Sequence, residues 1–213
     1  MAQEAADDED VRAARIRGPK GQAILAATRH LIGRVGVEGA TFDAITAEAG
    51  VARGAVFWAF GSKERLMLTL LEDDARARLD SLEGAVSAAR SADDLVDALA
   101  GQVRGFVEED LGVHVLLQEL GSIALREPSV RAALAKRRRE WSATFAGLLE
   151  AKQAEGAIDL ATDPATAAAL VTAVGHGLAI NALLDPREDP APIIEGGRSW
   201  VRGLLARPRA SKR

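Results

Sequence analysis

The apolar residues of this chain recur at spacings of three and four almost throughout, and this periodicity restricts what the chain can fold into. Between residues 20 and 35, apolar side chains fall on one face of a helix, with Pro19 before them and Gly36 after them. No stretch alternates Val, Ile, Thr or aromatic residues with polar ones, as a half-buried strand would. The sequence therefore predicts an all-α protein.

Signals for helix starts and stops divide the pattern into about nine helices. Thr41 and Ser91 have the residue type and spacing of N-caps, and Gly50 breaks the helix that Thr41 begins. Pro128 and Pro164 suit the first position of a helix. The expected helices are 20–35, 42–49, 53–59, 62–79, 92–106, 112–125, 128–156, 164–184 and 193–205.

The composition excludes several classes of protein. Hydrophobic residues make up 48% of the 213 residues and charged residues 27%, as in a globular chain that is long enough to bury a core. Because the chain contains no cysteine, disulfide scaffolds, thiolate metal sites and thiol nucleophiles are excluded. The acidic first ten residues do not have the form of a secretory signal, so we expect a cytoplasmic protein.

The net charge of −4 argues against a nucleic-acid partner only while it is summed over the whole chain. Residues 1–10 carry five acidic residues and no basic one. Residues 11–65 carry nine basic residues against four acidic ones, which gives a net charge of +5. One segment is therefore basic although the chain as a whole is acidic.

Residues 41–60, inside this basic segment, have the pattern of a helix-turn-helix, because a glycine turn joins two short helices. From Gly36 to Glu64 the sequence reads GVEGATFDAITAEAGVARGAVFWAFGSKE. Over residues 21–71 the chain resembles the N-terminal DNA-binding domain of the TetR/AcrR family of transcriptional repressors. This resemblance implies a three-helix DNA-binding domain followed by a larger helical domain for ligand binding and dimerisation.

The motif contains several candidates for contact with DNA. Thr41 begins a helix whose unpaired backbone N–H groups can hold a phosphate. The guanidinium of Arg53 has two N–H donors in one plane that can bind a guanine edge together. Lys63 supplies a single positive charge for the DNA backbone. Trp58 either packs against the following helix or contacts the groove. The DNA-binding candidates are Thr41, Ala52, Arg53, Gly54, Ala55, Phe57, Trp58, Lys63, Arg15, Arg17 and Lys20.

The chain departs from the family pattern at three positions of this motif. The family usually has Tyr in place of Phe57, often His in place of Ala59, and Ser or Thr in place of Ala52. The missing tyrosine hydroxyl removes a common phosphate contact, and Ala52 offers no side-chain cap. We therefore expect the basic residues before the first helix to supply much of the DNA affinity. The alternative is a family member that has lost specific DNA binding and acts as a protein partner.

The larger part of the chain resembles the BetI-like type of C-terminal domain, on the evidence of residues 175–186, GHGLAINALLDP, and of Trp141. The resemblance implies a dimer formed by the last two long helices and an apolar effector pocket. The pocket candidates are aromatic or polar residues on otherwise aliphatic helices, namely Phe106, His114, Gln118, Trp141, Phe145 and His176. The interface candidates are Val171, Gly175, Leu178, Ala182, Trp200 and Leu204.

These patterns predict four parts of the chain. Residues 1–17 form an acidic leader and a basic arm without order, and residues 18–65 form the helix-turn-helix domain. Residues 66–206 form the ligand-binding and dimerisation domain, and residues 207–213 form a basic tail. In the larger domain the basic run 136–139 is interpreted as a solvated face, with Arg137 or Arg138 at the edge of an apolar stripe.

Other functions find less support in the sequence. Residues 164–184 carry no charge and have the length of a membrane span, about 20 residues, but alanine and polar residues dilute their hydrophobicity. Gly175-x-Gly177 follows no strand and lacks the third glycine of a nucleotide-binding fingerprint. We found no nucleophile–base pair, metal spacing or phosphate loop. We therefore expect no enzyme, cofactor, metal or membrane partner, but operator DNA, a small-molecule effector and a second copy of the chain.

Overall fold

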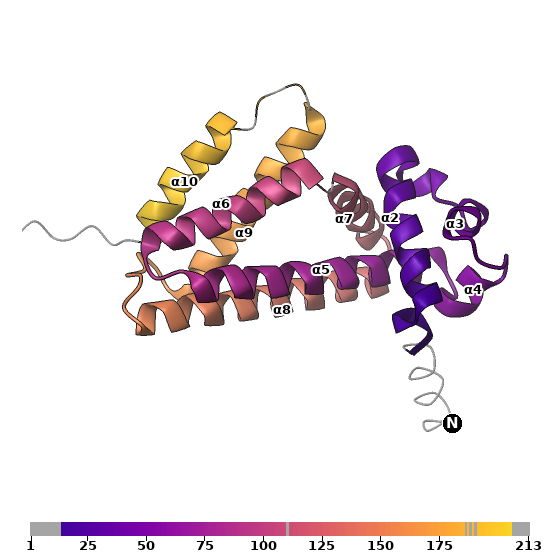
Figure 1. Ribbon diagram of the computed structural model, residues 1–213, viewed down its shortest axis with the longest axis horizontal. Helices are drawn as coiled ribbons and strands as arrows, with labels where there is room; N and C mark the ends of the chain where they lie inside the picture. The colour runs from indigo at the N-terminus through magenta and orange to yellow at the C-terminus, as the bar shows by residue number, and fades with distance from the viewer. Residues whose placement is uncertain (1–13, 110, 186, 188, 190, 206–213) are drawn as a thin grey trace, which may run out of the picture. The chain divides into compact units, whose positions relative to one another are not determined.

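The computed structural model describes residues 14–109, 111–185, 187, 189 and 191–205. Besides a helical turn at residues 14–17, these residues form nine α-helices, which confirms the all-α prediction. They are α2 (Pro19–Gly39), α3 (Phe42–Ala49), α4 (Ala55–Phe60), α5 (Lys63–Ala88), α6 (Ala92–Glu109), α7 (Leu111–Ala124), α8 (Pro128–Ala154), α9 (Pro164–Leu184) and α10 (Ala191–Leu205) (Figure 1). Among the described residues, no helix is sufficiently long and apolar to cross a membrane. The predicted basic tail lies outside the described residues.

Local signals set the ends of several helices where the sequence predicted them. Thr41 caps α3, because its Oγ1 accepts a hydrogen bond of 3.2 Å from the backbone N–H of Ala44. Gly50 ends α3 in the left-handed conformation, with φ of 63°. Asp163 caps α9, with an Oδ1 that accepts from the N–H of Thr166 at 2.9 Å. Gly36, with φ of 72°, interrupts α2 at the predicted end of that helix.

The chain divides into two compact units, residues 1–74 with 112–134 and residues 75–111 with 135–213. The sequence predicted one division between residues 65 and 66, where the helix-turn-helix motif ends. The compact units instead divide α5 and α8 internally and group α7 with the N-terminal helices. Sequence motifs mark local structure, whereas compactness depends on which apolar faces pack together.

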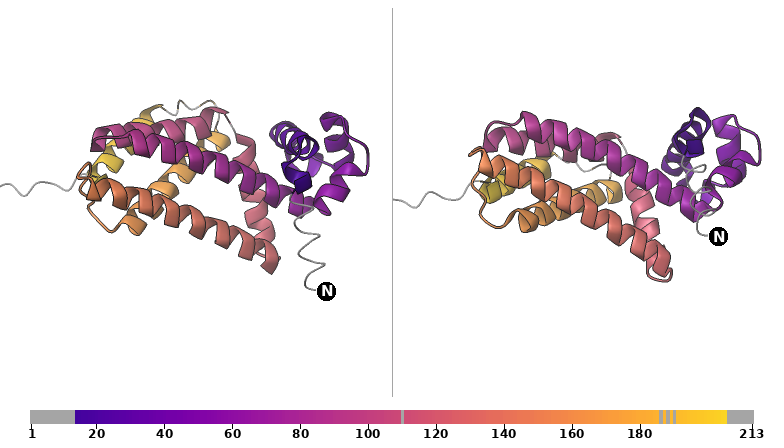
Figure 2. Two further views of the ribbon diagram at one scale, coloured as in Figure 1. Left: turned by 60° about the horizontal axis from the view of Figure 1, so that its bottom comes forward. Right: turned by 90° about the horizontal axis from the view of Figure 1, so that it is seen from below.

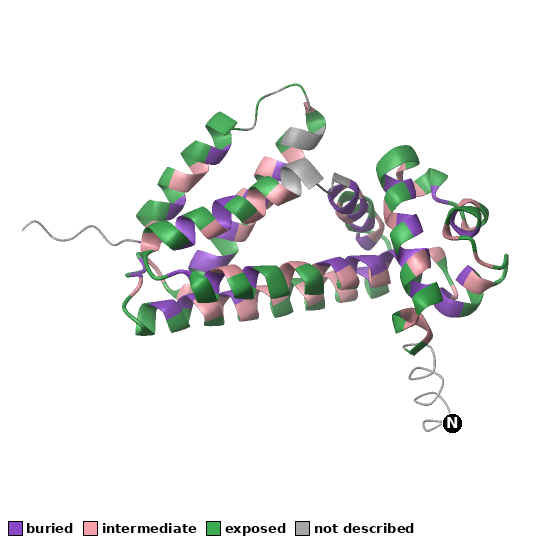
Figure 3. Cartoon of the chain, viewed as in Figure 1, coloured by how far each residue is buried: buried purple, intermediate pink, exposed green. Residues whose placement is uncertain are grey.

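The first unit has a core to which each of its helices contributes. Figure 3 shows buried residues along α7 and at the start of α5. Ile45, Val56 and Phe60 have no exposed surface, whereas Ala49 and Val51 are half-buried. The core includes Ile24, Ile32, Ile45, Val56, Phe60, Leu66, Met67, Leu70, Leu71, Leu116 and Leu120. This packing fixes α3 and α4 against α2 and α5 and leaves the outer side of α4 in solvent.

The residues directly before α2 are ordered against the first unit, although the sequence predicted disorder up to residue 17. Residues 14–17 form a helical turn that ends in a bend at Gly18. The turn approaches α2 so closely that a Cβ on Gly21 would lie 2.2 Å from the carbonyl oxygen of Ile16. The Ile16 side chain packs against the core. Glycine at position 21 is therefore what allows this backbone to lie on α2.

The second unit is a helical bundle in which α6, α9 and α10 pack against one another (Figures 1 and 2). Its core includes Leu82, Val86, Leu95, Leu99, Phe145, Leu149, Ala167, Ala168, Val171 and Leu205. Two ion pairs connect α10 to α6, one between Arg198 and Asp97 and one between Arg202 and Asp93, with Nε 2.7 Å from Oδ1 in the second. The short segment after α8 donates to the last carbonyls of α10, from Asp159 N to Leu205 O at 3.0 Å.

A buried lysine closes the end of α5. The Nζ of Lys152 on α8 donates to the carbonyl of Ser87 at 3.1 Å and to that of Ala89 at 2.9 Å. It also pairs with Oε2 of Glu155 at 2.9 Å. The residue retains 6% exposure. These bonds satisfy carbonyls that the helix end cannot satisfy itself.

We expect Lys152→Met to lower the melting temperature by several degrees, because the carbonyls of Ser87 and Ala89 would lose their donor at a cost of about 1–3 kcal/mol. A circular dichroism melt measures the change. Lys136→Met is the matched control, since it removes the same charge from an exposed site of α8, where Lys136 Nζ lies 3.7 Å from Glu140 Oε1. The control should cost less than about 0.5 kcal/mol. Equal melting temperatures for the two variants would contradict the role of Lys152.

Candidate nucleic-acid interface and effector cavity

Helices α3 and α4 are joined by a tight turn with the geometry of a helix-turn-helix. The N–H of Val51 donates a hydrogen bond of 3.2 Å to the carbonyl of Thr46, and this bond closes the turn around Gly50. The N–H of Ala55 donates to the carbonyl of Ala52 at 2.8 Å, and α4 begins at Ala55, two residues later than predicted. No side chain caps α4, whose N-cap residue is Gly54 and not Ala52 as expected.

The two sides of α4 differ sharply in exposure. Val56, Ala59 and Phe60 face the core, whereas Phe57 is 64% exposed and Trp58 is 62% exposed. Trp58 thus lies outside the core, and its ring is covered by the Arg15 guanidinium, whose Cζ is 3.4 Å from the ring centroid. Two adjacent exposed aromatic rings on so short a helix are a feature of binding surfaces.

Arg53, the predicted base-reading residue, is exposed and already pairs with a carboxylate. Its Nη2 donates to Oδ2 of Asp43 at 3.2 Å, and its Nε lies 3.2 Å from Oδ1. Asp43 lies in the first turn of α3, and sequence reasoning missed it because the two residues are ten positions apart on different helices. Because both side chains are exposed, solvent screens the pair and its contribution to stability is small. The Asp43 carboxylate orients the guanidinium of Arg53, and another acceptor can take the place of this carboxylate.

The other DNA-binding candidates occupy the surface of the same unit. Lys63 is half-buried, and its Nζ donates to the carbonyl of Glu38 at 3.2 Å. Thr41 is exposed, as are Arg17 and Lys20, whereas Arg15 is half-buried. Among the small candidates, Ala52 and Gly54 are exposed and Ala55 is half-buried.

In the second unit, a cavity of about 50 Å³ lies among α5, α6, α8 and α9. It brings together three predicted pocket residues, Trp141, Phe145 and His176. The indole Nε1 of Trp141 donates to Oγ1 of Thr172 at 3.1 Å. Gln102 and Thr172 also line the cavity, and sequence reasoning missed both because neither differs from an ordinary polar helix residue.

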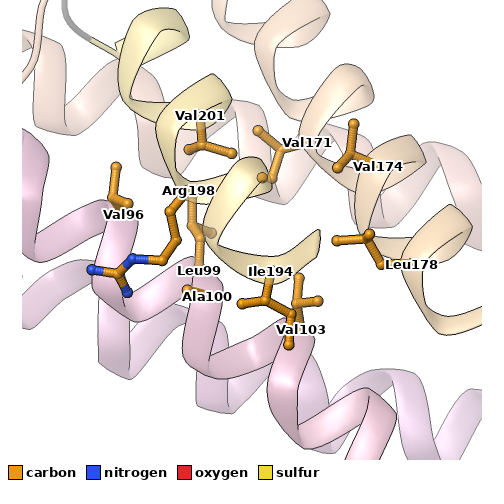
Figure 4. A pocket seen from close by; sticks show the side chains of 12 residues that line it. Val96, Leu99, Ala100, Val103, Val171, Val174, Leu178, Ile194, Arg198 and Val201 are labelled. Carbon is orange, nitrogen blue, oxygen red and sulfur yellow. The ribbon is translucent and has the colours of Figure 1, made fainter. Parts of the chain in front are cut away.

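A second cavity of about 30 Å³ lies among α6, α9 and α10 (Figure 4). Figure 4 shows aliphatic side chains from all three helices around it, with the guanidinium of Arg198 turned away from Val171 and Leu178. The two cavities have four lining residues in common, Leu99, Val103, Val171 and Gly175. A wall of these residues therefore separates two apolar spaces, each with room for at least one water.

Other pocket candidates lie elsewhere. His114 is buried at 4% exposure and Gln118 is exposed, but both are on α7 in the first unit, so neither lines a cavity of the second. The sequence rule that selected them, a polar residue on an aliphatic helix, does not indicate which unit the helix joins. The side chain of Phe106 lies outside the described residues.

The exposed apolar positions of α9 and α10 coincide with the predicted interface only at Trp200. Val171 and Gly175 are buried within the second unit and line both cavities, so they face inward. The large apolar residues in solvent are Leu170, Leu184, Ile193 and Trp200, with exposed fractions of 40%, 76%, 37% and 41%. Leu178 and Leu204 are half-buried, and the side chain of Ala182 lies outside the described residues.

His176 is the titratable residue of the first cavity. Burial lowers its pKa from the ordinary value, and repulsion from the Arg137 guanidinium lowers the pKa further. Arg137 is half-buried, whereas Arg138 is exposed, so Arg137 is the residue at the edge of the apolar stripe. The cavity therefore presents a neutral imidazole at pH 7. Within the described residues, no group of three acidic or histidine side chains could hold a metal ion.

Comparison with known proteins matches both parts of the chain to one family. Residues 24–70 match the profile described as bacterial regulatory proteins, tetR family, and residues 114–206 match the BetI-type transcriptional repressor C-terminal profile. The chain belongs to the TetR family of bacterial regulators. Membership of this TetR family explains the helix-turn-helix and identifies the chain as a transcriptional regulator and not an enzyme.

A curated relative of this TetR-family chain is the HTH-type transcriptional repressor AcnR of Corynebacterium jeikeium, 33% identical over 122 residues. The match covers 54% of this chain and 64% of the relative, so the chain spans less than two thirds of that protein.

Two solved structures have the same fold. A putative regulator from Saccharomonospora viridis in complex with choline has a TM-score of 0.72 at 17% identity, covering 88% of this chain and 97% of that chain. FadR of Bacillus subtilis in complex with stearoyl-CoA has a TM-score of 0.70 at 16% identity, covering 86% of this chain and 98% of that one. At these identities the likeness shows the fold alone.

The lowered pKa of His176 makes the stability of this TetR-family chain depend on pH. Below about pH 6.5 the unfolded chain takes up a proton at this histidine more readily than the folded chain does. The contribution of neutral His176 to the free energy of unfolding is therefore fully present above that pH. It is lost as the pH falls through the pKa that His176 has in the folded chain. We expect His176→Gln to lose less stability than the wild type between about pH 7 and pH 5 in urea denaturation. Parallel pH dependences of the two proteins would contradict the assignment.

Proposed function

We propose that this chain is a homodimeric repressor that binds a pseudo-palindromic operator through α3 and α4 and leaves it when a small molecule binds the second unit. The observation that carries the proposal is the surface of α4, which exposes Phe57 and Trp58 beside two guanidinium groups in a domain that matches the TetR profile. The repressor assignment is supported by the likeness to the transcriptional repressor AcnR.

Each part of the surface has a distinct role in this proposal. The N-terminus of α3, capped by Thr41, and the Lys63 ammonium bind phosphates and set the register on the duplex. Arg53 exchanges the Asp43 carboxylate for a guanine edge in the major groove, where two of its N–H groups donate to the O6 and N7 acceptors. Phe57 supplies apolar contact without the hydroxyl that its relatives use, so more of the affinity rests on charge.

Dimerisation is supported by the uncharged α9 and by the four large apolar residues that α9 and α10 leave in solvent. Exposed apolar residues of this size are typical of surfaces that a partner covers. A two-fold dimer presents two copies of α4, which suits half-sites separated by one helical turn of about 34–36 Å or a multiple of it.

Effector release is supported by the two apolar cavities and their shared wall. Each is smaller than a typical small-molecule site of about 300–1,000 Å³, so a ligand must displace the wall to enter. A ligand that prefers the widened arrangement lowers operator affinity only if this arrangement binds DNA less well. The solved relatives bound to choline and to stearoyl-CoA hold very different molecules, so they do not define the effector class of this chain.

A fluorescence anisotropy titration tests the proposal. The full chain is added to a duplex selected from a random library, and the titration is repeated at several salt concentrations. We expect sequence-specific binding, two chains per duplex, and an affinity that falls steeply with salt because phosphate contacts release counterions. Binding that ignores sequence, or the absence of binding, would favour the alternative of a family member that acts through a protein partner.

Arg53→Ala and Lys63→Ala should separate base reading from backbone contact. We expect Arg53→Ala to weaken binding and to remove about 1–3 kcal/mol of preference at one operator position. Lys63→Ala should weaken binding to all duplexes alike and reduce the logarithmic salt slope by about 1. Titrations against single-base operator variants measure both effects. Unchanged base preference in both variants would contradict the division of roles.

A further inference from the structure

The Arg15 side chain and the Trp58 ring form a stacked pair on the surface of the first unit. The Cζ of Arg15 lies 3.4 Å from the ring centroid. Trp58 belongs to α4, whereas Arg15 belongs to the helical turn before α2. The pair therefore connects the basic segment before the domain to the helix that is proposed to enter the major groove.

Contacts with α2 fix the backbone of the helical turn that contains Arg15. The carbonyl of Ile16 accepts a hydrogen bond of 3.3 Å from Nε2 of Gln22, and the Ile16 side chain packs against the core. The absence of a Cβ on Gly21 permits this approach, as a methyl group there would overlap the Ile16 carbonyl. The N–H of Gly18 closes the turn on the carbonyl of Ala14 at 3.1 Å. Arg15 thus belongs to a turn that packs against α2 and not to a segment without contacts.

Stacking on a ring also restricts the guanidinium itself. A guanidinium is planar, and its N–H donors point outward in that plane. When one face covers an indole, the donors at the edge remain directed to the sides of the ring. The side chain has then lost much of its rotamer freedom before any ligand arrives, so less order must be gained on binding.

We propose that Trp58 is a positioning residue that holds Arg15 as a preformed bidentate donor for DNA beside the recognition helix. The proposal rests on the function proposed above. The partner atoms are a pair of acceptors on the duplex, either two phosphate oxygens or the O6 and N7 edge of guanine. The base preference and salt slope distinguish these two sources.

Because Trp58 acts through Arg15, the two residues should be coupled in DNA binding. Arg15→Ala and Trp58→Ala should each weaken operator binding about tenfold, and the double variant should be no weaker than the singles. Trp58→Phe should retain most of the affinity, because a phenyl ring also supports a cation. Arg15→Lys should lose affinity despite keeping the charge, since an ammonium has no planar fork.

Arg17 provides the matched control for this double-mutant cycle. It lies in the same helical turn and is exposed, and Arg17→Ala removes the same charge as Arg15→Ala. We expect the losses from Arg17→Ala and Trp58→Ala to multiply in the double variant, because each side chain acts independently. Circular dichroism melts of all variants confirm that the fold persists.

Anisotropy titrations of these variants against the selected operator give the outcome. A double variant within about twofold of Arg15→Ala supports the proposal, whereas a loss of about a hundredfold, the product of the single losses, overturns it. A uniform loss with a smaller salt slope identifies phosphate as the partner, and a changed preference at one base pair identifies guanine.

Tryptophan fluorescence of the free protein tests the stack without DNA. With Trp141→Phe and Trp200→Phe in the background, Trp58 is the remaining tryptophan of the three in the chain. Arg15→Ala should shift or brighten its emission, whereas Arg17→Ala should not, and equal spectra for both would overturn the stack. A wild-type chain that binds no selected duplex would overturn the proposed function, while this spectral comparison would still judge the stack.

Discussion

Burial of the apolar face of α5 is the constraint on which the rest of the structure depends. Near its start, Leu66, Met67, Leu70 and Leu71 are almost fully buried in the core of the first unit, and further along Leu82 and Val86 belong to the core of the second. Residues three and four apart share one face of a helix, so these side chains form one stripe that neighbouring helices must cover. In the first unit those neighbours include α2 and α4. The orientation of the helix-turn-helix is thus a consequence of core packing.

The proposed DNA surface is formed by side chains of the first unit that do not pack in its core. Once Val56, Ala59 and Phe60 of α4 are committed to the core, Phe57 and Trp58 have to face outward on a helix of six residues. The guanidinium groups beside them contact partners at the surface: Arg53, which is exposed, pairs with Asp43, and Arg15, which is half-buried, lies on the indole. Such partners orient a side chain but leave it able to exchange one acceptor for another.

Sequence reasoning found those site residues whose chemistry is conspicuous within their own helix. Trp141, Phe145 and His176 stand out on aliphatic helices, and all three line one cavity. The same rule selected His114 and Gln118 on α7, because it cannot tell which core a helix will join. The inward face of α9 could not be predicted either. Apolar and small residues occur on all sides of α9, so its sequence does not distinguish Val171, which is buried, from Leu170, which is exposed.

The sequence by itself determined the helices, most of their ends, the helix-turn-helix and the basic segment that contains it. These depend on residues within a few positions of one another, through periodicity, capping and turn conformation. The tertiary structure alone decided that Arg15 lies on Trp58, that Arg53 pairs with Asp43, and that Lys152 closes the end of α5. Each of these contacts joins different elements, so it depends on how apolar faces pack and not on the spacing of residues along the chain.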